Sequence, residues 1–198
     1  MANNADLVQY GRDIAVRLAD YDAANALPAN TVAWDGTWGG DWTAPGYTSG
    51  GLHVTTEVGR SPVEVDQELD PIALVATSRT TTMNTNLSQL DMDTVADATG
   101  QGTVTTQAAT TAARGYKEYA VDAVVDSDGI AVGFDIKGRN GEPIRIFGPR
   151  GFPNAGMSLD FERDSATGVL TPLSVTLTPD PAQSNKILII RTITPIAS

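Results

Sequence analysis

The chain has 198 residues and a net charge of −11, because 24 Asp and Glu outnumber 13 Lys and Arg. A surface this acidic repels polyanions, and without clustered Lys and Arg there is no counterion release to drive tight phosphate binding, which argues against a nucleic-acid-binding protein. The absence of Cys excludes disulfides, thiolate metal sites and cysteine nucleophiles.

Composition predicts a mainly β protein. Thr, Val, Ile and Gly recur along the chain, whereas long runs of Leu, Glu, Lys and Ala are absent. Aromatic residues make up only 6%, so the predicted core consists of Val, Ile, Leu and Ala. The first residues lack the pattern of a signal peptide, and no apolar run approaches the roughly 20 residues of a membrane helix. We expect one domain over residues 1–198, folded in a cytoplasm without membrane insertion.

The N-terminal quarter begins with a polar stretch, residues 1–12, predicted to be a mobile arm. Residues 13–20 alternate as a strand does, although Ile14 and Leu18 also fit a helical stripe with preceding residues. The Gly-rich stretch 22–50 predicts a long loop that forms either a hairpin or an extended arm.

Extended structure dominates the next segment. Alternation predicts a strand over 52–56 and another over 63–67, and a further extended element follows within 71–90. A short helix is expected over about 88–98, ended by Gly100. Residues 100–115 are low in complexity, and fit either an exposed loop or an edge strand.

The C-terminal half carries the clearest strand and turn signals. Strands over 119–125 and 130–136 flank Asp-Ser-Asp-Gly, which predicts a tight hairpin. The remaining predictions are a turn at 139–142, strands over 144–147, 157–161, 170–177 and 186–192, and turns at 164–168 and 179–185. The pattern predicts two packed antiparallel sheets, a sandwich or open barrel, with one short flanking helix.

No constellation in the sequence predicts catalysis, a cofactor or a metal site. His53, the single histidine, stands in an alternating strand, where a surface or half-buried position is expected. Asp126 and Asp128 resemble the start of a calcium loop, but Ile130 begins a strand at once, so a turn explains them better. The carboxylates within 57–70 predict a solvated strand face, although a hydrolase could use two of them.

Three tryptophans, Trp34, Trp38 and Trp42, lie within the Gly-rich loop. Trp is costly to expose and is enriched at binding hot spots, so the cluster predicts either core or an interface anchor. Stacking against a carbohydrate is the third interpretation, and from the sequence all three stay open.

Motifs between residues 34 and 98 carry a family resemblance. Trp34–Leu52 reads W-D-G-T-W-G-G-D-W-T-A-P-G-Y-T-S-G-G-L, where a Trp and G-Y-T precede a strand. The motifs that follow are, in order, Glu57, Asp66-Gln67, Asp70-Pro71-Ile72 and Thr77-Ser78-Arg79. Their order and spacing resemble the major tail tube proteins of long-tailed, siphovirus-type bacteriophages. Two features depart from that family: the Trp-rich stretch is fuller, and Thr80 stands where Asp is common.

The resemblance implies a structural virion protein and not an enzyme. Such subunits form hexameric rings that stack head to tail into the phage tail tube, through which DNA leaves without specific binding. The implied partners are copies of the chain itself and the tape measure, tail tip or initiator and tail terminator proteins, all assembled in the host bacterial cytoplasm. No cofactor is implied. The residues expected at inter-subunit or inter-ring contacts are Trp34, Trp38, Trp42, Tyr47, Glu57, Asp66, Asp70 and Arg79.

Within this interpretation, the 34–50 loop and the N-terminal arm are expected to join successive rings. The region from Glu57 to Asp70 is expected at a seam between subunits or near the bore. The alternative outside this class is a carbohydrate-binding β-sandwich of a phage or cell surface, in which the Trp cluster would form the stacking platform.

Overall fold

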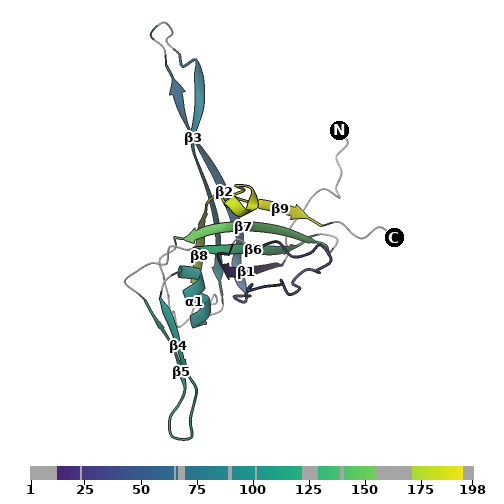
Figure 1. The fold of residues 1–198 in the computed structure, drawn as a ribbon, viewed down its shortest axis with the longest axis vertical. Coiled ribbons are helices and arrows are strands. Elements are labelled where there is room, and N and C mark those ends of the chain that lie inside the picture. The colour runs from purple at the N-terminus through teal and green to yellow at the C-terminus, as the bar shows by residue number, and fades with distance from the viewer. Residues whose placement is uncertain are drawn as a thin grey trace, which may run out of the picture.

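The structure is a computed structural model that describes residues 13–22, 24–64, 66, 70–88, 91–100, 102–121, 129–138, 141–154 and 171–193. It is mainly β, with antiparallel strands and one short α-helix (Figure 1). The elements are β1 (Ile14–Asp20), β2 (Thr48–Val63), β3 (Ala73–Leu87), α1 (Met92–Thr99), β4 (Thr103–Gln107), β5 (Tyr116–Ala120), β6 (Ile130–Lys137), β7 (Pro143–Pro153), β8 (Thr171–Leu177), the 3-10 turn η2 (Pro181–Gln183) and β9 (Ile189–Thr192).

Seven strands form one curved sheet in the order β1-β6-β7-β8-β3-β2, with β9 beside β7. The sheet bends along β7, which pairs with β6 from Pro143 to Gly151, with β9 over Ile144–Phe147 and with β8 over Gly151–Pro153. Gly148 and Gly151 lie at this bend because a Cβ at either position would collide with Leu177 or Val175 of β8. The end strands β1 and β2 approach within 8 Å between Cα atoms, so the sheet is an open barrel.

The main core fills the inside of this curve. Alternate residues of β3 and β8 point inward, including Met83, Leu87, Leu173 and Val175. They pack against inward side chains of β1 and β6 and against Ala98 of α1. Strand β6 is buried on both faces, because residues 24–45 cover its outer side. We call residues 24–45 the covering segment.

Several predicted elements are confirmed. The strand alternative for residues 13–20 holds as β1, and the strand predicted over 52–56 lies within β2. Of the strand predicted over 63–67, only Val63 belongs to β2, which ends there; Glu64 and Asp66 are not in a strand, and residues 65 and 67 lie outside the described residues. The turn at 139–142 is confirmed by the Gly138 amide donating to the Glu142 carbonyl, and that at 179–185 contains η2. Residues 100–115 were predicted as either an exposed loop or an edge strand, and residues 103–107 form the strand β4.

The helix is confirmed in type but begins later than predicted, at Met92. The amide of Ser88 still donates to the carbonyl of Tyr47, which extends the strand pairing past the end of β3. Gly100 ends the helix as expected, since its φ of 60° is the left-handed conformation that glycine adopts without strain.

The predicted hairpin between 119–125 and 130–136 is wrong. Tyr119 and Ala120 pair with Val104 and Thr103, so β5 forms a separate two-stranded sheet with β4. Strand β6 instead lies between β1 and β7. Because β6 is buried, the backbone groups along both of its edges need strand partners, and the long-range pairings with β1 and β7 supply them in place of a local hairpin. The predicted N-terminal arm, the strand over 157–161 and the turn at 164–168 fall outside the described residues.

Candidate assembly surface

The outer half of the β2–β3 hairpin projects far from the body as a two-stranded ribbon (Figure 1). We call residues 57–80 the arm; its described residues are 57–64, 66 and 70–80. Every one of these except Gly59 is exposed. The inner half of the same hairpin joins the sheet, because β3 pairs with β8 only over Thr81–Leu87. The body therefore holds the root of the arm while both faces of the ribbon are open to solvent.

The arm concentrates exposed apolar side chains. Nine large hydrophobic residues are exposed among those described, and five of them are on the arm: Val58, Val63, Ile72, Leu74 and Val75. Leu74 and Val75 are 64% and 51% exposed. Because they are consecutive in a strand, they point to opposite faces, so both faces of the ribbon are apolar. Apolar side chains gathered in this way on a soluble surface mark a site that another surface covers.

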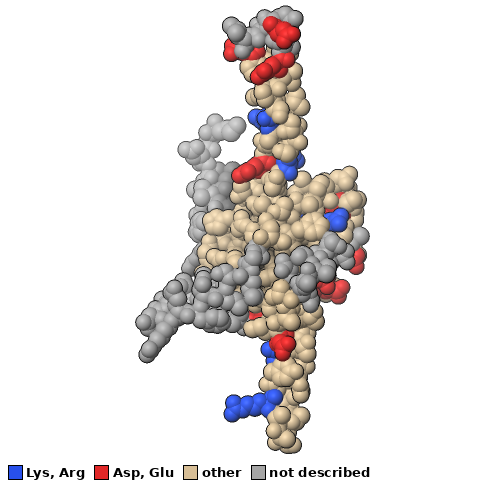
Figure 2. Space-filling model, turned by 90° about the vertical axis from the view of Figure 1, so that its left-hand side faces the viewer, with Lys and Arg blue, Asp and Glu red and all other residues tan. Residues whose placement is uncertain are grey.

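Charges are ordered along the arm. Exposed Glu64, Asp66 and Asp70 lie toward its end, whereas Arg60 and Arg79 are exposed along its shaft. Figure 2 shows acidic side chains at the projecting end, basic ones below them and acidic atoms again at the root, where Glu57 lies. The arm thus presents an acidic end on an apolar ribbon that carries two arginines.

The arm brings together four of the residues predicted as contact sites. Glu57 pairs with Thr80 at its root and Arg79 pairs with Val58. Asp66 and Asp70 lie near its far end, and all four predicted residues are exposed. Sequence reasoning missed Ile72, Leu74 and Val75, although the apolar run P-I-A-L-V-A directly after an acidic turn is a signal that could have indicated them.

A second projection extends from the opposite end of the molecule (Figure 1). The β4–β5 hairpin is tied to the helix at its root, where Lys117 Nζ lies 2.7 and 2.6 Å from carboxylate oxygens of Asp91 and Asp93. Tyr116 and Val121 of this region are exposed hydrophobics, and Arg114 is exposed in the connecting turn. The molecule is therefore elongated, with one projecting hairpin at each end.

The three tryptophans do not share one environment. Trp38 is only 2% exposed and packs on Gly133 of β6 and edge-on against Trp42, with 5.0 Å between ring centroids. Trp42 also packs against Phe147. Trp34 is half-buried, and its indole nitrogen donates to the carbonyl of Asp135. Of the interpretations left open by the sequence, core packing therefore fits Trp38, which anchors the covering segment to the sheet.

A buried ion pair holds the covering segment in place. Arg145 and Asp135 are both fully buried, and their Nε and Oδ1 atoms lie 3.3 Å apart. Arg145 also donates to the carbonyls of Ala29 and Val32, and the Asp35 amide donates to Asp135 Oδ2. Burial raises the pKa of the Asp135 carboxyl above its usual value, and the nearby Arg145 charge offsets part of that shift. The segment predicted as a hairpin or extended arm is instead fastened across the sheet.

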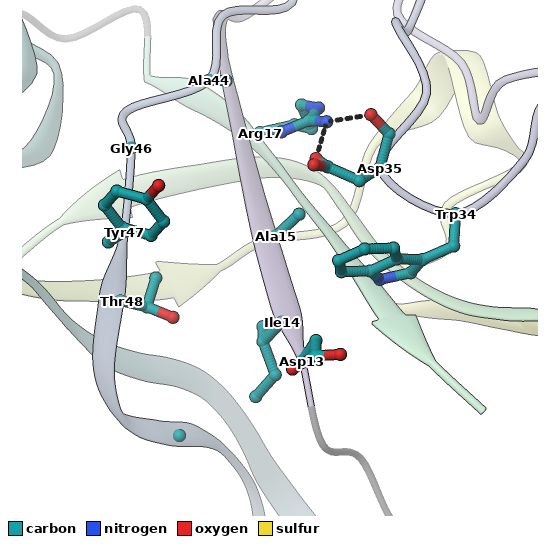
Figure 3. A pocket seen from close by; sticks show the side chains of 11 residues that line it. Asp13, Ile14, Ala15, Arg17, Trp34, Asp35, Ala44, Gly46, Tyr47 and Thr48 are labelled. Carbon is teal, nitrogen blue, oxygen red and sulfur yellow. Dashed lines mark hydrogen bonds and ion pairs between the residues drawn. The ribbon is translucent and has the colours of Figure 1, made fainter. Parts of the chain in front are cut away.

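A groove lies over β1, between the covering segment and the chain that enters β2 (Figure 3). Its volume is about 690 Å³. Tyr47, which was also predicted as a contact residue, lines one wall and is 81% exposed. Trp34 and Asp35 line the other wall. Arg17 is buried beneath and donates to Asp35 Oδ1 at 2.7 Å. The groove is thus lined by two aromatic side chains and by an ion pair whose two members already contact each other.

Among the described residues, Asp97 of α1 has the most strongly shifted pKa. It lines a small pocket of about 90 Å³ together with Asp20 and Asp41. Burial raises the pKa of the Asp97 carboxyl to about 6, and the negative charges of Asp20, Asp93 and Asp91 add to the shift. Among the described residues, no group of three or more His, Asp or Glu is placed to hold a metal ion.

Comparison with known proteins adds no family assignment. No protein-family model matches the sequence, and no curated protein matches it. Within the described part of the chain, no helix has the length and apolar character needed to cross a membrane.

Proposed function

We propose that this protein is a self-assembling structural subunit of a phage tail tube. The observation that carries the proposal is the arm, a projecting ribbon with exposed apolar side chains on both faces. A two-stranded ribbon is marginally stable alone in water, so an arm of this kind is stabilised by a surface that covers it. The sequence motifs between residues 34 and 98 supply the tail tube interpretation, including the six-membered ring.

The elongated shape supports head-to-tail association. One projection with an acidic end and another at the opposite end give a subunit whose two ends differ. An interface between two different surfaces repeats, and it produces closed rings or open filaments according to the rotation between subunits. Tape measure, tip and terminator proteins are the further partners we propose, with the virion tail as the location. The net charge of −11 favours a bore that DNA passes without sticking.

The test is whether the purified chain assembles and whether the arm is required. We expect negative-stain electron microscopy and sedimentation at high concentration to reveal rings or hollow tubes. In a short-arm variant, residues 60–77 are replaced by an Asn-Gly turn that joins the paired residues Gly59 and Ser78. This variant should keep the circular dichroism spectrum of the β body yet remain monomeric. A wild-type chain that stays monomeric even with tail-tip seeds would remove the proposal.

A carbohydrate-binding function is the second candidate, and the groove between Trp34 and Tyr47 is the observation in its favour. Trp38 and Trp42 pack against the sheet, so the three indoles do not form one stacking platform. Lys137 Nζ also lies 5.0 Å from the Trp34 ring centroid and occupies part of its face. Saturable binding in a glycan screen that is lost in Tyr47→Ala would support this candidate over the tube.

A further inference from the structure

Strand β1 has an outer edge with free backbone groups. At its C-terminal part, Leu18 and Thr43 exchange two backbone hydrogen bonds of 3.0 and 2.8 Å across this edge. Peptide groups of an antiparallel strand alternate in direction, so Ile14 and Val16 point the same way as Leu18. Asp13, of the opposite parity, accepts from the Lys137 amide of β6. The amide groups of Ile14 and Val16 and the Ile14 carbonyl therefore face the groove without a backbone partner among the described strands.

The groove beside this edge has room for another strand. Its floor and walls include the small residues Ala15, Ala44, Gly46 and Gly51, which leave the backbone accessible (Figure 3). The Val16 carbonyl is already capped by Arg17 Nη1 at 3.0 Å, so the edge is open chiefly around Ile14. The groove lies where the two end strands of the open barrel face each other. An extended segment added here would continue the sheet beyond β1.

We infer that the groove receives the arm of a second copy of this chain, with the β3 half of the arm, Ala73–Thr80, adding as a strand to the outer edge of β1. The inference rests on the proposed self-assembly and names the surface that covers the arm. Strand addition of this kind takes its affinity from backbone hydrogen bonds and its register from side-chain contacts.

The β3 half of the arm has an unpaired backbone edge that could pair with the edge of β1. Beyond Thr81, β3 pairs only with β2, so residues 73–80 carry an unpaired edge along the whole arm. Unpaired strand edges are templates for pairing with another chain, and residues 73–80 contain no proline to prevent it. The arm points away from the body, so it cannot reach the groove of its own subunit (Figure 1).

Charges favour the same occupant. The lining carboxylates Asp13 and Asp35 are 53% and 52% exposed at their side chains, whereas that of Arg17 is 8% exposed. Lys137, 3.7 Å from Asp13, and Arg17, 2.7 Å from Asp35, offset part of this negative charge. The shaft of the arm presents Arg60 and Arg79; Glu57 lies at the root beside Arg79, and the other described acidic residues of the arm lie farther out. An arm laid along β1 would therefore bring its two arginines to the carboxylates and carry its acidic end past the groove.

The absence of Cys in the chain permits a direct test by site-directed cross-linking. Ala44→Cys is placed in the groove and Val75→Cys on the arm of a separate preparation, and the two proteins are mixed under assembly conditions with a short bismaleimide. The matched control replaces the arm variant by Ala113→Cys, an exposed position in the β4–β5 turn. We expect mass spectrometry to detect covalent heterodimers between positions 44 and 75 and at least tenfold fewer between 44 and 113.

A blocking variant gives a second readout. Ala44→Trp fills the groove at an exposed position and should prevent assembly while the thermal unfolding of the monomer stays unchanged; Ala113→Trp should assemble normally. Assembly without heterodimers above the control, or with Ala44→Trp as efficient as wild type, would overturn the inference but leave the proposed function standing. Failure of the wild type to assemble at all would overturn both. A glycan that fills the groove without affecting assembly would assign the groove to carbohydrate instead.

Discussion

Removing the apolar character of the arm should weaken assembly without unfolding the subunit. The perturbation is the triple variant Ile72→Ser, Leu74→Ser and Val75→Ser, at positions that are 59%, 64% and 51% exposed in the subunit. Full burial of such a side chain is worth about 1.5–3 kcal/mol, so covering the exposed half of all three contributes about 3 kcal/mol per arm. Since 1.4 kcal/mol corresponds to tenfold in an equilibrium constant, the association constant should fall about 100-fold.

The assay is the critical concentration for assembly, measured by light scattering and sedimentation and checked by electron microscopy. We expect this concentration to rise about 100-fold in the triple variant, with the melting temperature of the monomer nearly unchanged because the substitutions are at the surface. Ile190→Ser, which alters an equally exposed apolar residue on β9, is the matched control. A triple variant that assembles at the wild-type concentration would refute the reasoning that the arm drives association.

Three further predictions concern the body of the subunit. The raised pKa of Asp97 means that its ionised form destabilises the fold above about pH 6, and that stability rises as pH falls from there toward 4. Asp97→Asn should therefore add about 1 kcal/mol to the free energy of unfolding at pH 8, after allowance for partial solvent exposure. Urea titrations should show that this gain is lost near pH 4. Arg145→Ala leaves Asp135 buried without its partner and should cost about 3–5 kcal/mol in chemical denaturation, with faster proteolysis of the covering segment as the specific sign. Gly133→Ala places a methyl group against the Trp38 ring and should cost about 1–3 kcal/mol, with a shift in tryptophan fluorescence; an unchanged spectrum would contradict that packing.

Local patterns predicted the elements whose cause is local. The alternation around Ile14 favoured the strand that became β1 but left a helix as the alternative, and Gly100 marked the helix end because the backbone conformation at that residue decides it. The prediction of a β5–β6 hairpin is wrong because strand pairing does not depend on local sequence alone. A turn sequence shows that the chain can reverse, but which strands pair is decided by the whole sheet. The partners that β6 takes along its two edges, β1 and β7, are not the strand that precedes it in the chain.

The candidate site was predicted in part. Its charged members on the arm followed from the motif order, but the apolar surface did not, because a ribbon exposed on both faces has no inside to impose alternation. The sequence also contains a signal for the ion pair that fastens the covering segment. Asp135 and Arg145 are directly opposed across β6 and β7, and the predicted turn at 139–142 lies midway between them. The carbonyls of Ala29 and Val32 that complete it are too distant in sequence for any spacing rule to indicate.

The register shift in the arm has a mechanical consequence. Between Gly59 and Arg60 the pairing skips Thr77, so the ribbon has one unpaired residue near its root. Such a bulge interrupts the ladder and lets the ribbon bend there more easily than elsewhere. Beyond it the arm behaves as a lever: at about 3.3 Å per residue it is about 20 Å long, so a bend of about 10° moves its end by about 3–4 Å. In the proposed tube, we expect copies joined through such levers to tilt relative to one another while each contact stays closed, so that the tube can bend.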